Sequence, residues 1–319
     1  MIEALQGIDS VRLNFNDDGR LFLNLTIAFI MFGIALELKP DDFKKLLKSP
    51  KPAFVGVLSQ FLLMPLLTFL IAIALGDIIT PTIGMGMILV ASCPGGNVSN
   101  FISSLAKGNV ALSVSLTAFS SLGGLILTPF NFAFWGNLYL KYGAHSEASS
   151  LVQNLQVDAV DVLQTIVMIL GIPLIIGIFA SSKFPGFTAS IVSWIKKLSI
   201  VIFIALIGII FASNFELFLK YIQYIFLIVL IHNALALTMG YFTGKAFGLE
   251  HQDRKTIAIE TGIQNSGLAL ALLFNPAVFP QDMAIGGMAF IAAWWGVWHI
   301  ISGLTIASFW GGFSIKKSA

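Results

Sequence analysis

The strongest constraint on this chain is a succession of long apolar runs in which charged residues are almost absent. A bilayer core about 30 Å thick is crossed by a helix of about 20 such residues. Membrane barrel strands would instead alternate over about ten residues. The sequence therefore predicts an all-α membrane protein with nine transmembrane helices, at about 21–38, 52–75, 82–106, 109–135, 157–180, 188–212, 217–247, 254–275 and 283–310.

The low charge content excludes several classes of protein. Charged residues make up 11% of the 319 positions, against about 25% in an ordinary soluble domain. A soluble protein of this size would need far more polar surface to cover its core. The composition therefore excludes a soluble enzyme and a disordered chain. The net charge of +2 is too small for a polyanion-binding surface, which excludes nucleic acid as a partner. The single cysteine, Cys93, excludes an internal disulfide and a cysteine-rich metal site.

Basic residues are distributed unequally over the connections between the runs, and this bias predicts the orientation. Alternate connections and the tail carry 14 of the 18 Lys and Arg residues, five of them between positions 39 and 51. The other side carries only Arg12, Arg20, Lys141 and Lys220. We therefore expect residues 1–20 to be a short external segment without a cleaved signal, and residues 311–319 to be a cytoplasmic tail.

Two runs are interrupted by residues that disfavour a continuous helix. The third contains Cys-Pro-Gly-Gly-Asn-Val-Ser-Asn at 93–100, and the eighth contains Glu-Thr-Gly-Ile-Gln-Asn-Ser-Gly at 260–267. Proline removes a helical donor and glycine adds chain freedom, so each stretch can unwind. Pairing runs one to four with runs six to nine brings the interruptions into register and inverts the second unit. This pattern predicts an inverted repeat, which is typical of transporters.

Glu260 is the acidic residue that stands out, because it lies inside an apolar run. A carboxylate at membrane depth costs several kcal/mol unless something compensates. One interpretation is that Glu260 reaches outward or is neutralised by Arg254 or Lys255. The other is that it binds a cation, which keeps the carboxylate ionised.

Neutral oxygen-bearing side chains accompany Glu260, and they narrow the choice of cation. The sequence has no His or Cys cluster for a transition metal, and calcium usually recruits more carboxylates. One carboxylate with several neutral oxygens suits a monovalent ion such as sodium, while a proton remains the alternative. A lone buried Gln can also serve as a hydrogen bond between helices. The candidate oxygens are unwound backbone carbonyls and the side chains of Gln60, Ser99, Asn100, Ser113, Thr117 and Gln264.

The interruptions also predict where an anion would bind. The half-helix after each break begins with free N–H groups and positive dipole character. This end favours a substrate carboxylate or sulfonate near Asn97 and Asn265. His299 has a simpler interpretation as a packed, hydrogen-bonded side chain.

Taken together, these motifs resemble the bile acid:sodium symporter family over nearly the whole chain. The resemblance is carried by residues 93–100, Lys107-Gly108-Asn109, Leu112-Ser113 with Thr117, Phe32-Gly33-Ile34-Ala35-Leu36, Asp42-Phe43, Gln60 with Met64-Pro65, residues 260–265, and Trp298-His299 with Ser302-Gly303. It implies one transmembrane transporter unit at 21–310. A core domain with two crossing discontinuous helices would comprise about 52–135 and 217–310, and a panel domain about 21–38 and 157–212.

The resemblance also implies two sodium sites and a substrate site. The first sodium site would use Ser99, Asn100, Ser113, Thr117 and Glu260. The second would use Gln60, Glu260 and Gln264 with the backbone carbonyls of Thr261 and Ile263. The substrate would lie near Asn97, Asn265 and His299. Relatives often have Asn after this His, where the present chain has Ile300.

The function implied is that of a sodium-coupled symporter, without an organic cofactor, that imports an organic anion by alternating access. The anion would be a bile acid, a steroid conjugate or a small carboxylate such as pantoate. We expect a monomer surrounded by lipid in the plasma membrane, the inner membrane of a bacterium. The alternatives are a proton-coupled transporter or a cation/proton antiporter, an intramembrane enzyme using His232, His299 and Glu260, and a receptor. The interpretation as an intramembrane enzyme lacks support because the sequence has no metalloprotease or nucleophile motif.

Overall fold

Helices form every regular element of the described chain, and one isolated β-bridge joins two of its connections. The computed structural model describes residues 2–9, 17–36, 49–76, 78–96, 98–143, 158–213, 215–275, 278–279, 283 and 285–312. In chain order the elements are α1 (Ile2–Asp9), α2 (Asp17–Ala35), α4 (Pro50–Leu58), η1 (Ser59–Leu63), α5 (Met64–Ala74), α6 (Pro81–Ser92), α7 (Val98–Leu105), α8 (Val110–Tyr142), α10 (Ala159–Ile166), η2 (Val167–Gly171), α11 (Ile172–Lys183), α12 (Pro185–Ser213), α13 (Phe215–Ala246), α14 (His251–Gly262), α15 (Ser266–Leu273) and α16 (Gly286–Gly311). The η elements are π-helical.

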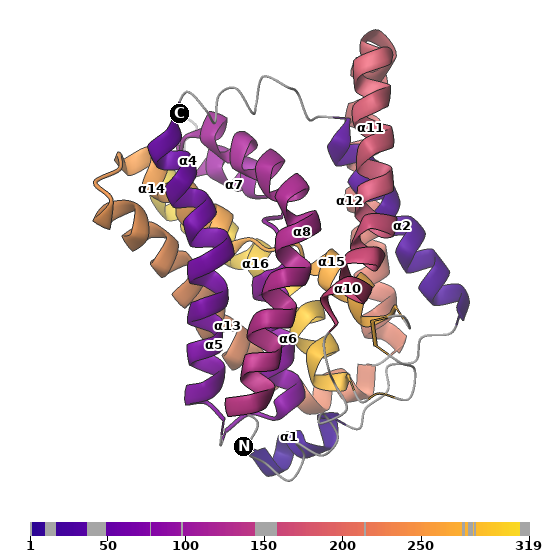
Figure 1. Ribbon diagram of the computed structural model, residues 1–319, viewed down its shortest axis with the longest axis vertical. Helices are drawn as coiled ribbons and strands as arrows, with labels where there is room; N and C mark the ends of the chain where they lie inside the picture. Colours follow the sequence, from indigo (N-terminus) through magenta and orange to yellow (C-terminus); the bar gives the residue numbers. More distant parts are fainter. Residues whose placement is uncertain are drawn as a thin grey trace, which may run out of the picture.

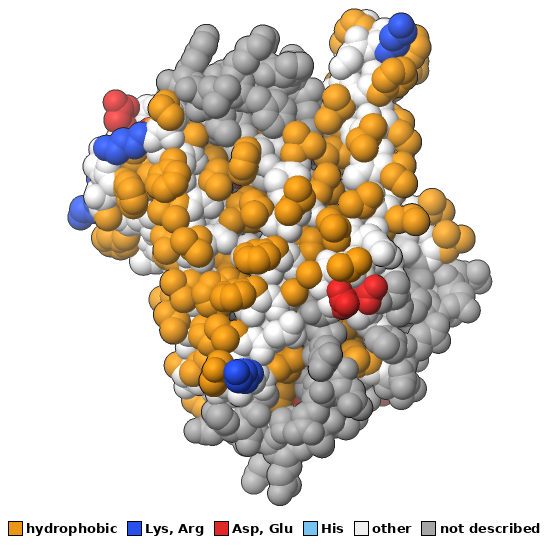
Figure 2. Space-filling view, in the orientation of Figure 1, with side chains coloured by type: hydrophobic (Ala, Val, Ile, Leu, Met, Phe, Trp, Pro, Cys, Tyr) orange, Lys and Arg blue, Asp and Glu red, His pale blue; other side chains and the backbone are white. Residues whose placement is uncertain are grey.

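Five helical segments of the described chain are long and apolar enough to cross a membrane. They are Pro50–Ala74, Val110–Tyr142, Ala159–Lys183, Phe215–Ala246 and Gly286–Gly311. Shorter apolar helices occupy Asn24–Gly33 and Pro81–Ser92. In Figure 2, hydrophobic side chains cover most of the described part of the face in view, and charged side chains are few. These findings agree with the predicted all-α membrane protein, while the count of nine spans stays a prediction.

Several helices begin or end beyond the apolar runs that predicted them. The run at 109–135 continues as a helix to Tyr142, because Tyr139 is buried against α6 and its hydroxyl reaches the backbone at Gly84. The first membrane helix begins at Asp17, four residues before the predicted start. The connection at 37–48, the segment at 144–157 and the tail beyond Gly312 lie outside the described residues.

The helices gather in two groups that are not contiguous in sequence. Helices α2, α11 and α12 pack together on one side of the molecule (Figure 1). The other group contains α13 packed on α14, and α16 packed on α6, α13 and α15. Helix α8 packs on α5, α6 and α7 in this second group and meets α10 at its border with the first. The division into panel and core domains stays a prediction.

A π-helical turn and a proline reshape the helix that carries Gln60. Pro65 lacks an N–H, so it cannot bond the carbonyl of Phe61 four residues earlier. The segment Ser59–Leu63 widens into a π-helix immediately before it, as often occurs at functional sites. The freed Phe61 carbonyl accepts a hydrogen bond of 2.9 Å from Asn131 Nδ2 on α8. This local distortion turns Gln60 inward, where its side chain is buried.

The N-terminal helix α1 docks through a buried carboxyl group. Asp9 is fully buried, and its Oδ1 accepts a hydrogen bond of 2.6 Å from Thr80 and another from Thr82. Thr80 is the residue preceding α6, so α1 is attached to the start of the first broken helix. Burial raises the pKa of Asp9, and the two hydrogen bonds act in the opposite direction.

This buried carboxyl predicts that docking of α1 depends on pH. A carboxyl whose pKa is higher in the docked state favours docking when it is protonated. Docking is therefore strongest below the ordinary pKa of Asp and weakens as pH rises through the raised value. We expect the protection of α1 amides against hydrogen exchange, corrected for the intrinsic rate, to fall as pH rises. Asp9→Asn should remove this dependence, and equal pH profiles for the parent and variant chains would contradict it.

Candidate functional site

The two interrupted helices meet at their breaks. Cys93 after α6 and Ile263 after α14 have extended backbones, and the two connections pair through an antiparallel bridge of Gly95 with Gln264. Gly96 N donates to Ile263 O at 2.7 Å, and Asn265 N donates to Pro94 O at 2.9 Å. Residues far apart in sequence are thereby brought to one point between four half-helices. Free helix ends on either side make this point a natural ion-binding region.

The carboxylate of Glu260 lies at this meeting point within a cluster of hydroxyl groups. Its Oε1 accepts hydrogen bonds from Ser99 Oγ at 2.7 Å and Ser113 Oγ at 2.5 Å, and Thr117 Oγ1 lies 3.3 Å from Oε1 and 3.2 Å from Oε2. Asn100 Oδ1 lies 2.9 Å from Ser113 Oγ and 3.2 Å from Thr117 Oγ1. The structure thus brings together all five side chains predicted for the first sodium site. Ser99 and Asn100 come from α7, and Ser113 and Thr117 from one face of α8.

The basic residues nearest in sequence do not neutralise Glu260. Lys255 Nζ donates instead to the carbonyls of Ala106 and Trp310, at 3.0 and 3.2 Å. Arg254 Nε donates to the carbonyl of Leu249 at 2.6 Å. Glu260 is only 4% exposed, so it does not reach outward either. Both parts of the simpler interpretation of Glu260 are therefore wrong, since hydroxyl groups, and not a basic side chain or bulk water, contact its carboxyl group.

A second group of oxygens surrounds the break after α14. Gln60 Nε2 donates to Gln264 Oε1 at 2.8 Å and to Cys93 O at 3.0 Å. Gln264 Nε2 donates to Thr261 O at 2.7 Å. The two glutamines and the Thr261 carbonyl predicted for the second sodium site are thus adjacent. The Ile263 carbonyl is also at the break, where it accepts the hydrogen bond from Gly96.

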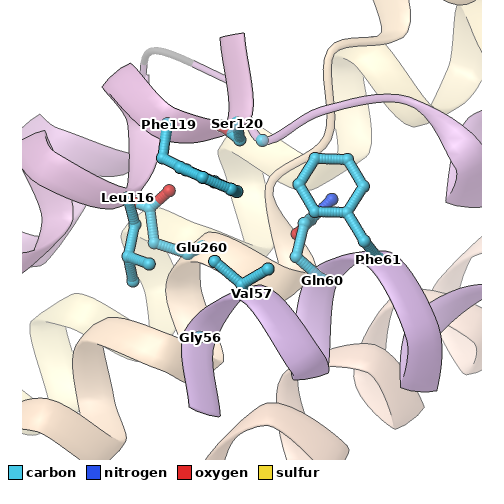
Figure 3. Close-up of a pocket in the computed structure, with 9 residues that line it drawn as sticks. Gly56, Val57, Gln60, Phe61, Leu116, Phe119, Ser120 and Glu260 are labelled. Carbon is cyan, nitrogen blue, oxygen red and sulfur yellow. The ribbon is translucent and has the colours of Figure 1, made fainter. Parts of the chain in front are cut away.

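A small cavity gives access to Glu260 from between α4–η1 and α8 (Figure 3). Val57, Phe61, Leu116 and Phe119 form apolar walls, while Gln60, Ser120 and Glu260 supply polar groups. A Cβ atom added at Gly95 would lie 3.1 Å from Glu260 Oε2, so the absence of a side chain there keeps this carboxylate oxygen accessible. The interior of the cavity that a water-sized sphere can occupy is about 10 Å³, which is room for about one water molecule. Its size suits a small ion or a single water better than an organic substrate.

The predicted substrate residues are only partly brought together. Asn265 precedes α15, where its Oδ1 accepts a hydrogen bond of 3.0 Å from Leu268 N, and its Nδ2 faces Met31 on α2 at 4.0 Å. His299 is buried on α16, and no described hydrogen bond joins its side chain to Asn265 or Glu260. Asn97 lies outside the described residues. Asn265 alone is therefore placed at the border between the two helix groups.

Three polar residues that sequence reasoning did not assign also lie at the breaks. Ser59 Oγ is 2.8 Å from Thr261 Oγ1. Asn233 Nδ2 donates to Gly262 O at 2.7 Å, and Ser302 Oγ donates to Asn233 Oδ1 at 2.5 Å. The signal available in the sequence was the one used for Gln60, an amide or hydroxyl inside an apolar run. The contacts of Ser59 and Asn233 each fix a residue of α14 next to the break, and Ser302 fixes Asn233.

The arrangement can bind a hard monovalent cation. It combines one carboxylate with hydroxyl, amide and backbone oxygens, and these are ligands of alkali and alkaline-earth ions rather than of transition metals. Within the described residues, no group of three His, Cys, Asp or Glu side chains could hold a metal ion. A single negative charge favours an ion of single positive charge.

Comparison with known proteins agrees with this site. Residues 24–221 match the Sodium Bile acid symporter family. The chain is 32% identical over 298 residues to an uncharacterized sodium-dependent transporter, YocS, of Bacillus subtilis, covering 93% of this chain and 85% of that protein. It is 32% identical to a probable chloroplastic sodium/metabolite cotransporter, BASS2, of rice, covering 84% of this chain and 62% of that protein. It is 27% identical to the rabbit ileal sodium/bile acid cotransporter, covering 86% of this chain and 78% of that protein.

Fold, site and sequence thus define a multi-pass membrane transporter rather than an enzyme. The chain belongs to the sodium/bile acid symporter family. This membership confirms the family and the transporter class predicted from the sequence. It supports sodium-coupled transport, and the residues that bind each ion and the substrate remain predictions.

Proposed function

We propose that the protein imports an organic anion together with sodium by alternating access, using the meeting point of the two broken helices as its ion site. The observation that carries the proposal is the convergence of three hydroxyl groups on the buried carboxylate of Glu260. This carboxylate has no basic partner among the described residues, so a bound cation would offset its desolvation. Membership of the sodium/bile acid symporter family supports sodium as that cation.

Two sodium ions would occupy the site, and Glu260 would contribute to both. The first ion would replace the hydroxyl–carboxylate hydrogen bonds and bind the oxygens of Ser99, Asn100, Ser113, Thr117 and Glu260. The second would bind Gln60, Gln264, Glu260 and the carbonyls of Thr261 and Ile263. The direct bond between the two glutamines would then have to open, since both amide oxygens would turn to the ion. Sodium binding would therefore rearrange the contact between η1 and the break after α14.

The substrate would bind between the core domain and the panel domain, next to Asn265. The N-terminus of α15 carries positive dipole character, and Asn265 faces α2 of the predicted panel. An anionic headgroup fits this position, whereas a cationic one would be repelled. We propose a carboxylate or sulfonate substrate, with Asn97 and His299 as further contacts. Core and panel would move relative to each other to expose the site to the cytoplasm.

The proposed stoichiometry makes transport sensitive to membrane potential. Two sodium ions with one monovalent anion move one net positive charge per cycle, and each charge is worth about 2.3 kcal/mol per 100 mV. We expect an inside-negative potassium diffusion potential to accelerate sodium-dependent uptake of taurocholate or pantoate into proteoliposomes. Uptake that ignores the potential would contradict this stoichiometry.

A sodium-dependent thermal-shift screen of organic anions on the purified protein tests the proposed function itself. A ligand that binds only the folded protein raises its stability in proportion to the logarithm of ligand concentration. We expect sodium to raise the melting temperature, and substrate anions to raise it further only when sodium is present. Stabilisation by acidification with no response to sodium would favour the proton-coupled alternative.

A further inference from the structure

We infer that Asn233 is a positioning residue for the second sodium site, and that Ser302 orients it. This inference rests on the proposed function, since it assumes that sodium binds at the break after α14. Asn233 is fully buried in the middle of α13. Its side-chain NH₂ group donates to the carbonyl of Gly262 at 2.7 Å, and its carbonyl oxygen accepts the hydrogen bond of 2.5 Å from Ser302 Oγ on α16.

The carbonyl that Asn233 holds lies between two proposed sodium ligands. The last carbonyls of a helix have no partner within it, and Gly262 ends α14. Its neighbours are Thr261 and Ile263, whose carbonyls are proposed to bind the second ion. Because successive peptide groups share a backbone, a fixed Gly262 carbonyl limits how the carbonyls on either side can rotate. Asn233 therefore sets the direction of backbone oxygens that it does not itself touch.

The close packing of α13 against α14 makes this contact rigid. A Cβ atom added at Gly262 would lie 2.4 Å from Leu237 Cδ2, and one at Gly240 would lie 2.8 Å from Ala258 Cα. The two helices thus approach each other through one glycine on each helix, and the glycine of α14 is the residue that Asn233 contacts. A displacement of Gly262 would require the whole interface to shift.

Gln60 makes the corresponding contact at the first break. It lies on the helix preceding the first interrupted helix, and its Nε2 donates to Cys93 O, directly after the end of α6. Asn233 lies on the helix preceding the second interrupted helix and donates to the last residue of α14. Runs two and seven are the ones that the predicted inverted repeat pairs. Each unit thus has one buried carboxamide that holds the end of its first half-helix.

The two carboxamides differ in what their oxygen atoms contact, and this difference assigns their roles. Gln60 lies across the break from Gln264, where its oxygen can turn to an ion. The oxygen of Asn233 is instead occupied by Ser302, whose Oγ also lies 3.2 Å from His299 O. The single hydroxyl proton of Ser302 serves the shorter contact, with Asn233. Gln60 is therefore suited to bind the ion, and Asn233 to hold the backbone that binds it.

The test is the sodium dependence of the melting temperature of the purified full chain, with choline replacing sodium at constant ionic strength. Loss of a residue that orients metal ligands typically weakens metal affinity about 10–100-fold, and we expect Asn233→Ala to raise the half-saturating sodium concentration by this factor. Ser302→Ala removes one neutral hydrogen bond and should raise the half-saturating sodium concentration about three- to tenfold. Ser302→Thr keeps the hydroxyl and should restore the parent value.

Thr68→Val is the matched control for a purely structural effect. Thr68 Oγ1 lies 2.7 Å from His232 Nε2, so the variant removes a buried polar contact to α13 one residue before Asn233. It should lower the melting temperature without moving the half-saturating sodium concentration. If Asn233→Ala behaves like this control, or if Ser302→Ala and Ser302→Thr give the same sodium response, the inference is wrong. An unsubstituted protein that does not respond to sodium would overturn the proposed function itself.

Discussion

Glu260→Ala should abolish sodium-dependent uptake while leaving the protein folded. Among the described residues of the site, Glu260 is the one with a charged side chain, and it would pair with the sodium ion. Breaking a buried charge pair costs about 3–5 kcal/mol. That cost corresponds to a loss of apparent sodium affinity of more than about 100-fold. Ser99, Ser113 and Thr117 can then bond to one another or to Asn100, whose oxygen already lies within reach. We therefore expect the sodium-free melting temperature to be unchanged or raised.

The matched control for this variant is Glu250→Ala. Glu250 immediately precedes α14, the helix that carries Glu260, and its side chain is exposed and makes no capping hydrogen bond. Removing it changes the net charge by the same amount without touching the break. Uptake into proteoliposomes should keep its sodium dependence in this variant. Sodium-dependent uptake that survives equally in both variants would contradict the assignment of Glu260.

Gly96→Ala should separate the two breaks and weaken sodium binding without removing any ligand. A Cβ atom at Gly96 would lie 2.9 Å from the Gln264 carbonyl oxygen and 3.3 Å from Ile263 Cγ2. The first is a backbone atom that cannot rotate away, so the hydrogen bond from Gly96 N to Ile263 O would have to lengthen. Overpacking of this kind costs about 1–3 kcal/mol, which predicts a fall in sodium affinity of about five- to 150-fold.

Gly208→Ala serves as the control, because a Cβ atom there would meet nothing within 4 Å. In a helix interior, Ala is favoured over Gly by about 0.5–1 kcal/mol, so this variant should be slightly more stable than the parent. Both variants are measured by sodium titration of the melting temperature. An unaltered half-saturating concentration in Gly96→Ala would mean that the contact between the breaks does not shape the ion site.

The sequence was sufficient to predict which local chemistry belongs together. Proline and glycine marked the first break and glycine marked the second, because these residues act on the backbone without tertiary help. A carboxylate inside an apolar run required compensation, and that argument led from Glu260 to the hydroxyls of Ser99, Ser113 and Thr117, which do contact it. Ser113 and Thr117 are four residues apart in α8, so they lie on one face of that helix.

Contacts that depend on tertiary packing could not be predicted in this way. The extension of α8 beyond its apolar run depends on Tyr139 packing against α6, which no local pattern indicates. Asn233 resembles any lone polar residue in a long apolar helix until its partner Gly262 is known. The bridge between Gly95 and Gln264 joins segments that are far apart in sequence. For the same reason, the resemblance to a family was needed to divide the oxygens between two ion sites.

Equilibrium binding of radioactive sodium to the purified protein tests the central claim most directly. The claim is that sodium neutralises Glu260 where the two breaks meet. The account predicts two sodium ions per chain for the unsubstituted protein and for Glu250→Ala, and almost no binding for Glu260→Ala. Sodium binding of equal stoichiometry and affinity in the Glu260→Ala variant would contradict it.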